Sequence, residues 1–422
     1  MIERPRDLDD NALLDLVQRQ TFRYFWDFAH PASGLARERS NISFGYGLEV
    51  ATSGGSGFGV MAVVVAVERG WISRQDGLEF LLKMTRFLTK AASSYHGVFP
   101  HFLDGASGRM IPFTRKDDGG DLVETCYLLA GLLCARQYFR GADASESLLR
   151  GRVDHLWREV EWNWHTRDGH NVLYWHWSPN NGWSMNHEVR GWNECLITYV
   201  LAAGSERYPI KPDVYHRGFC EGRDFRNGRS YYGIELPLGP DCGGPLFFSH
   251  YTFLGLDPRG LKDRYADYWE QNLRHTRINR EHCVRNPNGY KGYGADCWGL
   301  TSSDNDEGYS PHSPTNDRGI ISPTAALSAF PYVPEHSMQA LRHFYHRLGD
   351  RIWGEYGFRD AFSEQRDWVA ESYLAIDQGP IVVMMENHRT GLLWNLFMSV
   401  PEVQAGLRAL GFSSPHLVST TP

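Results

Sequence analysis

Apolar residues recur three and four positions apart in many segments of the chain, the spacing that places them on one face of an α-helix. Loops rich in Gly, Pro, Asp, Asn and aromatic residues separate these segments. No fixed-period repeat or low-complexity linker divides the pattern, which favours one continuous helical domain over residues 1–422. The predicted helices include 10–29, 57–70, 74–93, 121–140, 190–203, 261–275, 334–348 and 380–398.

The segment from Glu161 to Trp177 has the pattern of a β-hairpin. Aromatic-rich stretches flank Arg167-Asp168-Gly169, and the Asp-Gly pair favours a tight turn, so we expect a small β-hairpin element here. The loops near 98–120, 222–250 and 285–322 are too long to be simple connectors. We expect them to build one wall of a binding site.

An α/α barrel would give these elements a common geometry. Its inner helices run parallel, so the loops that precede them meet at one end. Side chains far apart in the sequence would then share one cleft. The glycine-rich segment 52–59 lacks the Lys and the preceding strand of a phosphate-binding loop, and we interpret it as a flexible helix entry.

The composition is that of a globular protein with a large core: 42% of residues are hydrophobic and 22% are charged. Aromatic residues make up 14%, with 14 Trp, and their flat faces suit either a sugar-binding cleft or an aromatic core. The net charge is −7 and no dense Lys/Arg tract is present. Nucleic acid and membrane are therefore not expected as partners.

The motifs of several other chemistries are missing from the sequence. Its seven Cys show no paired metal-ligand spacing and are expected to be buried free thiols, so neither a metal nor a cofactor is predicted. Neither a His-Glu-x-x-His pair nor a Gly-x-Ser-x-Gly motif occurs. The first residues lack an apolar signal core, so we expect a cytoplasmic location, or a periplasmic one if a signal has been removed.

The first group of carboxylates is Asp117, Asp121 and Glu124, just before a long apolar run. If the helix begins early, the three share a face and could hold sugar hydroxyls or a water molecule. In a capping box, by contrast, Asp121 accepts from first-turn amides and Glu124 reaches back to the cap amide. On these residues alone, we favour the capping box.

The second candidate is Glu194, which precedes the apolar part of the helix predicted at 190–203. Its aromatic and apolar surroundings would disfavour the charged form and keep a proton available for a leaving glycosidic oxygen. Alternatively, Glu188 or Glu194 stabilises a helix N-terminus or pairs with Arg190. Without further context, this structural interpretation is the stronger one.

The third candidate is Asp377, which precedes Pro380 in the first turn of a predicted helix. An Asp here is usually a cap, but at the mouth of an inner helix it would also point into the cavity. There the helix dipole would keep it ionised, as a general base requires. Together with a desolvated Glu194, it would give the pair of carboxyl groups that glycoside hydrolysis uses.

Several loop residues could contact a sugar. Indole faces can stack on pyranose rings, although about half of the loop tryptophans are expected to pack in the core instead. These tryptophans are Trp162, Trp164, Trp175, Trp177, Trp183, Trp192 and Trp298. Residues 303–308 resemble part of a calcium loop but lack the alternating ligands and terminal Glu of an EF-hand. We expect a solvated turn or a substrate loop there.

Ordered motifs resemble those of bacterial glucoamylase-like proteins, which include the endo-β-1,2-glucanases of glycoside hydrolase family 144. The motifs are Gly120-Asp121-Leu122-Val123-Glu124-Thr125, Gly191-Trp192-Asn193-Glu194, Tyr309-Ser310-Pro311-His312-Ser313-Pro314 and Ile376-Asp377-Gln378-Gly379-Pro380. The resemblance runs over nearly the whole chain, from Thr21-Phe22-Arg23-Tyr24-Phe25-Trp26 to Glu386-Asn387-His388-Arg389-Thr390-Gly391-Leu392-Leu393-Trp394.

The resemblance implies an all-α fold, an (α/α)6 barrel, and an inverting, endo-acting attack on β-1,2-glucan that yields short oligosaccharides. It implies that Glu194 is the general acid and Asp377 the base that activates water. Asp117, Asp121 and Glu124 match acidic cleft positions, as alternatives or as substrate holders. The expected substrate-binding residues are Trp192, Asn193, Trp298, His312, Gln378 and Arg190.

Two other functions remain open at this stage. One is an exo-acting, sophorose-releasing hydrolase, or a transglycosylase, that uses the same cleft. The other is a non-catalytic glucan-binding protein whose acids only cap helices and bind sugar hydroxyls. The sequence indicates no protein partner.

Overall fold

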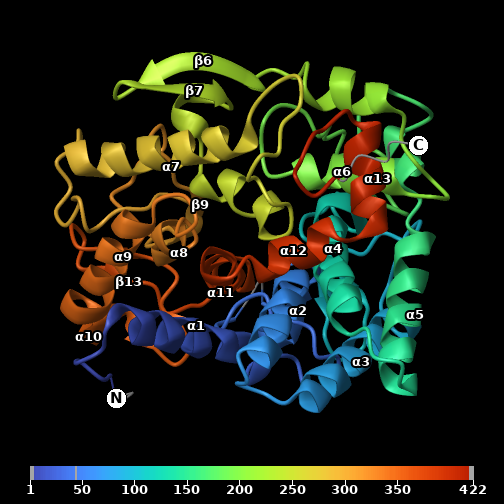
Figure 1. Ribbon diagram of the computed structural model, residues 1–422, viewed down its shortest axis with the longest axis horizontal. Helices are drawn as coiled ribbons and strands as arrows, with labels where there is room; N and C mark the ends of the chain where they lie inside the picture. The colour runs from blue at the N-terminus through green and yellow to red at the C-terminus, as the bar shows by residue number, and fades with distance from the viewer. Residues whose placement is uncertain (1–3, 43–44, 418–422) are drawn as a thin grey trace.

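The computed structural model describes residues 4–42 and 45–417 and is mostly helical (Figure 1). The α-helices of this part of the chain are α1 (Asp10–Trp26), α2 (Ser53–Glu68), α3 (Arg74–Lys90), α4 (Leu122–Tyr138), α5 (Ala144–Glu159), α6 (Leu196–Gly204), α7 (Tyr268–Arg285), α8 (Pro323–Leu327), α9 (Pro334–Arg342), α10 (Gly349–Ile352), α11 (Ala375–Arg389), α12 (Leu392–Met398) and α13 (Pro401–Ala409).

Two kinds of helix alternate along the chain. Almost every residue of α2, α4, α6, α8 and α11 is buried, as expected for helices that are apolar all round. Helices α1, α3, α5, α7 and α9 bury only part of their surface; α3, for example, buries Leu78, Leu81, Met84, Thr85 and Leu88. In Figure 1, α11 lies at the centre, with α1, α3, α5 and α7 around the periphery.

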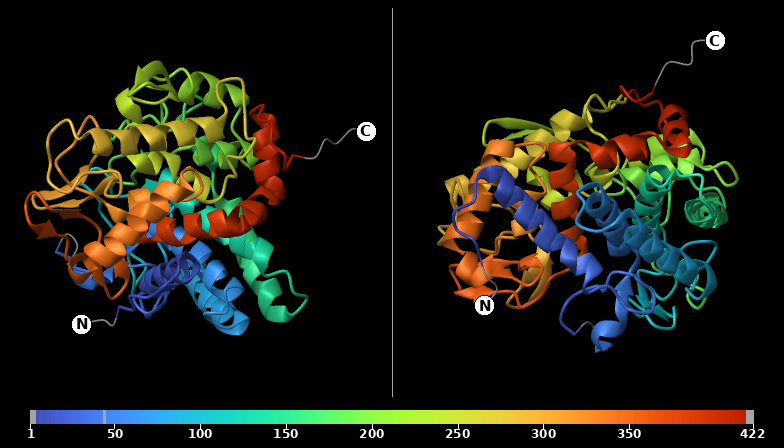
Figure 2. Two further views of the ribbon diagram at one scale, coloured as in Figure 1. Left: turned by 60° about the vertical axis from the view of Figure 1, so that its left-hand side comes forward. Right: turned by 60° about the horizontal axis from the view of Figure 1, so that its bottom comes forward.

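The strands are short, and their pairs are antiparallel. One three-stranded sheet contains β1 (Val50–Thr52), β2 (Phe102–Asp104) and β3 (Met110–Ile111). The other strands form two-stranded sheets: β4 (Gly120–Asp121) with β5 (His176–Trp177), β6 (Arg226–Tyr231) with β7 (Ile234–Leu238), β8 (Ser302–Asn305) with β9 (Gly308–Pro311), β10 (Trp353–Gly354) with β11 (Gly357–Phe358), and β12 (Phe362–Ser363) with β13 (Trp368–Val369). The β6–β7 hairpin lies at the edge of the molecule in Figure 1 and stays on the outside in Figure 2.

The hairpin predicted between Glu161 and Trp177 is wrong. Trp162–Thr166 forms a 3-10 helix instead, because Trp162 is fully buried against Trp157, with ring centroids 5.7 Å apart. The predicted turn exists, with positive φ at residues 167–169. However, β5 pairs with β4 rather than with the segment before the turn, and this pairing places His176 opposite Asp121.

Several helix limits also differ from the prediction. Helix α5 was not predicted, because its narrow apolar stripe is set among charged residues. Helix α7 begins at Tyr268, after the cap Asp267, and extends to Arg285 instead of covering 261–275. The helix predicted at 380–398 starts earlier, at Ala375, and is divided in two at Gly391, which has a φ of 71°.

Buried apolar side chains of the described residues form one large cluster from Leu13 to Phe412, and a small one of Val50, Phe102 and Ile111. Within this part of the chain, no helix is long and apolar enough to cross a membrane.

Helices α2 and α4 approach so closely that their contact excludes side chains. A Cβ atom on Gly57 would lie 2.1 Å from the carbonyl oxygen of Tyr127, and one on Gly131 would lie 2.1 Å from that of Gly57. Both distances are far inside van der Waals contact. The glycine-rich segment predicted to be a flexible helix entry is therefore part of α2, and its glycines serve helix packing.

We predict that Gly131→Ala lowers the free energy of unfolding by about 1–3 kcal/mol, because the new methyl group forces two backbones apart. Gly151→Ala is the matched control, because nothing lies within 4 Å of that position in α5. The control is expected to raise the free energy of unfolding by about 0.5–1 kcal/mol. Chemical denaturation measures both, and equal values for the two variants would contradict the close contact.

Candidate active site

The N-terminal ends of α2, α4 and α6 are joined by hydrogen bonds. The Gly54 amide at the start of α2 donates to Oε2 of Glu124 in α4 at 2.9 Å. The Tyr127 hydroxyl, also from α4, donates to the carbonyl oxygen of Glu194 at 3.0 Å. Thr252, in a short buried helix, donates to the same carbonyl at 2.6 Å.

Helices α8 and α11 meet in the same way. Thr324 Oγ1 in the first turn of α8 donates to the carbonyl oxygen of Asp377, in the first turn of α11, at 2.7 Å. Helix α11 in turn contacts the start of α2, where a Cβ on Gly55 would lie 2.7 Å from that of Ala375. We call the region where these helix ends meet the mouth. It comprises Gly54, Asp121, Glu124, Glu194, Tyr251, Thr324 and Asp377.

Asp121 is fully buried, and its carboxylate has three donors. The Glu124 amide donates to Oδ1 at 2.9 Å, Trp175 Nε1 donates to Oδ1 at 2.9 Å, and His101 Nδ1 lies 3.1 Å from Oδ2. Burial alone would raise the pKa of Asp121, but the His101 hydrogen bond and the charges of His176 and His101 lower it. Asp121 is therefore an ionised helix cap.

The capping box predicted for Asp121 and Glu124 is only half formed. Asp121 does cap α4, but the Glu124 carboxylate bonds to Gly54 across the helix contact rather than to the cap amide. The predicted helical face is also wrong, because α4 begins at Leu122, after Asp117 and Asp121. Burial raises the pKa of Glu124, while the positive charge of His101 opposes this effect.

Asp117 joins Asp121 and Glu124 from the loop before β4. His176 Nε2 lies 3.3 Å from Asp117 Oδ2 and 3.6 Å from Asp121 Oδ2. Burial, with the negative charge of Asp121, raises the pKa of Asp117 to about 7, and burial lowers the pKa of His176 to about 4. The three side chains each offer a ligand atom within 4.8 Å of the others, a spacing that a cation could use.

Glu194 lies just before α6, whose first residue is Leu196, in partly buried surroundings. Burial raises the pKa of its carboxyl to about 7. The desolvation predicted from its aromatic neighbours is therefore present, and a fraction of Glu194 keeps its proton at neutral pH.

Asp377 does not have the ionised state predicted for it. It is 1% exposed, and burial followed by the negative charge of Asp360 raises its pKa well above the usual value. Asp377 donates a hydrogen bond to Asp360, whose own pKa is raised to about 7 by burial and by the charge of Asp304. The helix dipole is too weak to offset this desolvation, and the two carboxyl groups form a pair that shares a proton.

Asp304 and Arg39 lie beside Asp360 and Asp377, and we call these residues together the second acidic group. The first acidic group is Asp117, Asp121 and Glu124. Arg39 Nη1 binds Asp304 Oδ2 at 3.1 Å, and the Asp304 amide donates to Asp360 Oδ2 at 2.7 Å. Asp304 is 9% exposed in β8, whereas Asp306, Glu307 and Gly308 are exposed, so the expected solvated turn lies at 306–308.

Tyr251 lies near carboxyls from both acidic groups. It is mostly buried, packs on Phe58 and Tyr127, and its hydroxyl has no hydrogen-bond partner within the described residues. After burial itself, the negative charges of Asp377, Glu124 and Glu194 are among the causes that raise its pKa. The three carboxyl groups therefore lie near one phenol.

Two hollows open next to the mouth and share Arg39 and Tyr309. One has a volume of about 310 Å³ and is lined by Glu38, Arg39, Thr52, His101, Phe102, Phe113, Tyr309, Leu374 and Ile376. The other, of about 420 Å³, is lined by Asn41, Ile42, Asp304, Asn305, Gly308, Trp368, Ala370, Glu371 and Ser372 in addition to the shared pair. The loops 98–120 and 285–322 therefore line this side, whereas the β6–β7 hairpin of loop 222–250 lies on the periphery.

Four of the predicted sugar contacts are buried in this structure, and their role in binding a sugar stays a prediction. Trp192 and Trp298 are 2% and 0% exposed, so neither indole face is free for a sugar, and Trp192 packs against Tyr268 and Phe253. His312 and Gln378 are also buried. These four side chains, like Asp377, would reach a substrate only after the surrounding loops move.

Arg190 and Asn193 have structural contacts at this position. Arg190 binds Glu188 and points toward the carbonyl oxygens of Arg217 and Gly218, away from the mouth. Asn193 Oδ1 accepts the Cys195 amide at 3.0 Å, just before the start of α6. The pairing of Glu188 with Arg190 is the structural alternative that the sequence offered.

The prediction missed several residues of the site, namely Arg39, His101, His176, Tyr251, Asp304 and Asp360. His101 and His176 belong to no recognisable spacing and come together only through the β4–β5 pairing and the loop before β2. Asp304 lies in the segment that resembles part of a calcium loop, which was a usable signal. Asp360 follows Arg359 in a short loop, and nothing in its local pattern marks it as buried.

The N-terminal ends of several buried helices lie together, carboxyl groups gather at these ends, and two hollows open beside them. These features define a helical protein with an acidic cleft. A family model named Glycoamylase, described as a glucoamylase, matches residues 186–401. The chain belongs to this family, which confirms the resemblance seen in its sequence motifs.

Two similar proteins have names that specify a substrate. An endo-β-1,2-glucanase from Chitinophaga pinensis, solved with sophorotriose and glucose, is 55% identical, with a TM-score of 0.95 over 97% of this chain and 100% of that one. An exo β-1,2-glucooligosaccharide sophorohydrolase (non-reducing end) from Parabacteroides distasonis is 46% identical over 96% of this chain. The chain spans 58% of the length of that relative.

An endo-β-1,2-glucanase from Talaromyces funiculosus, solved with sophorose, is only 11% identical but has a TM-score of 0.63 over 95% of this chain and 92% of that one. At this identity the likeness concerns the fold alone.

We predict that His101→Gln destabilises the protein in a pH-dependent way. Burial alone would lower the pKa of His101, but the charges of Glu124, Asp121 and Asp117 and the Asp121 hydrogen bond raise it from 6.5 to about 9. The protonated imidazole therefore stabilises the fold fully below pH 6.5, and this effect is lost as the pH rises through about 9.

The loss of unfolding free energy in His101→Gln should accordingly be larger at about pH 6 than at about pH 10, as measured by denaturant titration. His155→Gln, at an exposed position of α5, is the control and should show no such difference. A loss independent of pH in His101→Gln would contradict the charged contact.

Proposed function

We propose that this protein is an endo-acting, anomer-inverting β-1,2-glucanase that releases short β-1,2-glucooligosaccharides. The observation that carries the proposal is the mouth itself: Glu194, just before α6 and with a pKa of about 7, and Asp377, in α11 and paired with Asp360, both lie near Tyr251. Glycoside hydrolysis with inversion needs one group that donates a proton and another that accepts one. The activity named for the Chitinophaga pinensis protein, which the chain covers in full, supports the choice of substrate.

In the proposed reaction, Glu194 donates its proton to the glycosidic oxygen as the bond from this oxygen to the anomeric carbon breaks. A water molecule attacks that carbon from the opposite face, and its proton passes to the Asp377–Asp360 pair, either directly or through a sugar hydroxyl. Because the two aspartates share one proton, one of them is available as the base. The sugar gains one water molecule, and its anomeric configuration inverts.

The remaining carboxylates have other tasks. Asp121 already accepts three hydrogen bonds and Glu124 bonds to the start of α2, so both are better suited to hold the site in shape than to transfer protons. Asp117, with a pKa of about 7 beside His176, is the group among the three that is best suited to contact a sugar hydroxyl.

For the fold, we propose a single domain built as an (α/α)6 barrel. The buried helices α2, α4, α6, α8 and α11, together with the short helix Thr252–Leu254, would form its inner ring. The half-buried helices between them in the sequence would form the outer ring. Hydrogen bonds and helix contacts around the mouth, and one large core cluster, support this arrangement.

An exo-acting sophorose-releasing hydrolase is the second candidate, because the Parabacteroides distasonis relative carries that name. Linear β-1,2-glucan digested over time and separated by chromatography distinguishes the two. We predict a mixture of chain lengths at the earliest times, because the hollows beside the mouth are open to solvent. Sophorose as the sole early product would favour exo cleavage, and binding of glucan without new reducing ends would indicate a non-catalytic protein.

We predict that Glu194→Gln lowers kcat on linear β-1,2-glucan by about 10²–10⁴-fold, because the amide cannot donate an acidic proton. Glucan binding should remain, as measured by calorimetry. Glu188→Gln is the matched control, because the Glu188 carboxylate binds Arg190 and Tyr174 rather than a mouth residue, and it should keep its activity.

The pH profile adds a second readout for the same group. Because Glu194 must be protonated, kcat/KM of the wild type should fall as the pH rises through about 7. The residual activity of Glu194→Gln should lack this limb. A wild-type rate in Glu194→Gln would remove Glu194 from the role of acid.

A further inference from the structure

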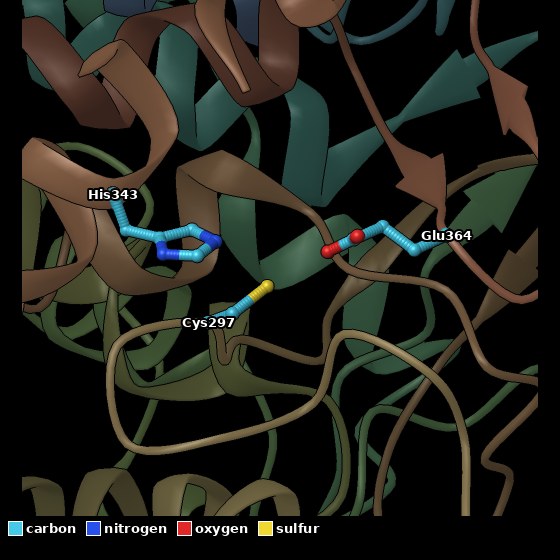
Figure 3. A group of neighbouring side chains, drawn as sticks. All are labelled: Cys297, His343 and Glu364. Atoms are coloured by element: carbon cyan, nitrogen blue, oxygen red, sulfur yellow. The ribbon is translucent and has the colours of Figure 1, made fainter. Parts of the chain in front are cut away.

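Outside the mouth, three side chains with metal-binding chemistry point toward one common space (Figure 3). The Cys297 sulfur, an imidazole nitrogen of His343 and a carboxylate oxygen of Glu364 all lie within 4.8 Å of one another. In Figure 3 the imidazole and the carboxylate approach from opposite sides, with the sulfur between them. Cys297 is 1% exposed, whereas His343 and Glu364 are partly buried.

The His343 ring is already oriented from behind. Its Nδ1 lies 3.1 Å from Asp296 Oδ2, and its Nε2 is buried without a hydrogen-bond partner in the described part of the chain. A carboxylate that holds one imidazole nitrogen fixes the tautomer and leaves the other nitrogen free to bind a metal. A buried ring nitrogen without any partner is costly, so its position calls for a ligand.

The local backbone is also shaped to admit the carboxylate. A Cβ on Gly292 would lie 2.4 Å from Glu364 Oε1, and Gly292 has a φ of +92°. Any other residue at that position would displace Glu364. His343 begins a π-helical turn that follows α9, a distortion that is frequent at functional positions of helices.

We propose that Cys297, His343 and Glu364 bind one Zn²⁺ ion, with a water molecule as the fourth ligand. Thiolate and imidazole donors select zinc over Mg²⁺ and Ca²⁺, which prefer oxygen ligands. Tetrahedral zinc, with Zn–S of about 2.3 Å and Zn–N of about 2.0–2.1 Å, needs donor atoms roughly 3.3–3.8 Å apart. The three donor atoms lie within 4.8 Å of one another, and a bound zinc ion would draw them to this spacing.

The ion would tie together three segments that are distant in the sequence. Cys297 lies in the loop after α7, His343 at the end of α9, and Glu364 in the turn between β12 and β13. The first of these segments leads into β8, which carries Asp304, and the third follows Asp360 by a few residues. Zinc would therefore stabilise the fold on the side of the molecule that supplies the second acidic group of the mouth.

The sequence did not predict this site, because its three ligands come from three distant segments and show no motif spacing. The expectation that all cysteines are simple buried thiols holds for Cys297 only if no metal binds.

The test uses the full chain, first stripped of metal with a chelator and then titrated with ZnCl₂ against a chromophoric chelator, with bound zinc counted by elemental analysis. One zinc per chain is expected for the wild type, together with a higher melting temperature. Asp296→Asn should weaken zinc binding by about 10–100-fold, the usual effect of removing the partner of a ligating His. His343→Gln and Cys297→Ser, which remove ligands, should weaken it more.

Cys242→Ser is the matched control, because Cys242 is half-exposed and lies outside the group, and it should bind zinc as the wild type does. Co²⁺ in place of zinc should give a thiolate charge-transfer band that Cys297→Ser lacks. His343→Gln, at a partly exposed position, keeps the test valid if Cys297→Ser does not fold. No bound zinc in the wild type, or equal binding in wild type and His343→Gln, would overturn the proposal, and the latter would place the ion elsewhere, as at Asp117, Asp121 and His176.

Discussion

The contact between α2 and α4 leaves no room for a side chain at Gly57 or Gly131, and the geometry of the mouth depends on this contact. Because Gly57 and Gly131 let the two helices touch, the start of α2 comes within hydrogen-bonding distance of Glu124. That bond fixes the position of the start of α2 relative to α4. Helix α11 packs on the same end of α2. Glu194, just before α6, is positioned against α4, and Asp377, in α11, is positioned against α2.

Burial gives these carboxyl groups different protonation states within a small volume. Asp121 stays ionised because three donors replace the water it has lost, whereas Glu194 has few such donors and its pKa rises to about 7. Asp377 and Asp360 resolve the same problem by sharing a proton. The protonation state of each carboxyl group thus follows from how many hydrogen bonds the group receives.

Periodicity in the sequence predicts the helices well where their patterns are long. The apolar spacing of α3 and α4 gave their limits within a few residues, and aromatic neighbours predicted that Glu194 is desolvated. Contacts between distant segments were out of reach. The β4–β5 pairing that brings His176 to Asp121 has no local signal, the ionised Asp377 was wrong because Asp360 is near only in space, and Trp192 gave no sign of being core rather than cleft.

The proposed reaction requires Glu194 and the Asp377–Asp360 pair to act on one bond from two sides. A crystal structure of the Glu194→Gln variant with a β-1,2-glucooligosaccharide tests this directly. We expect a glycosidic oxygen within hydrogen-bonding distance of residue 194, and a water molecule or sugar hydroxyl between the anomeric carbon and Asp377. A sugar chain bound away from Tyr251, with neither carboxyl position near a glycosidic bond, would contradict it.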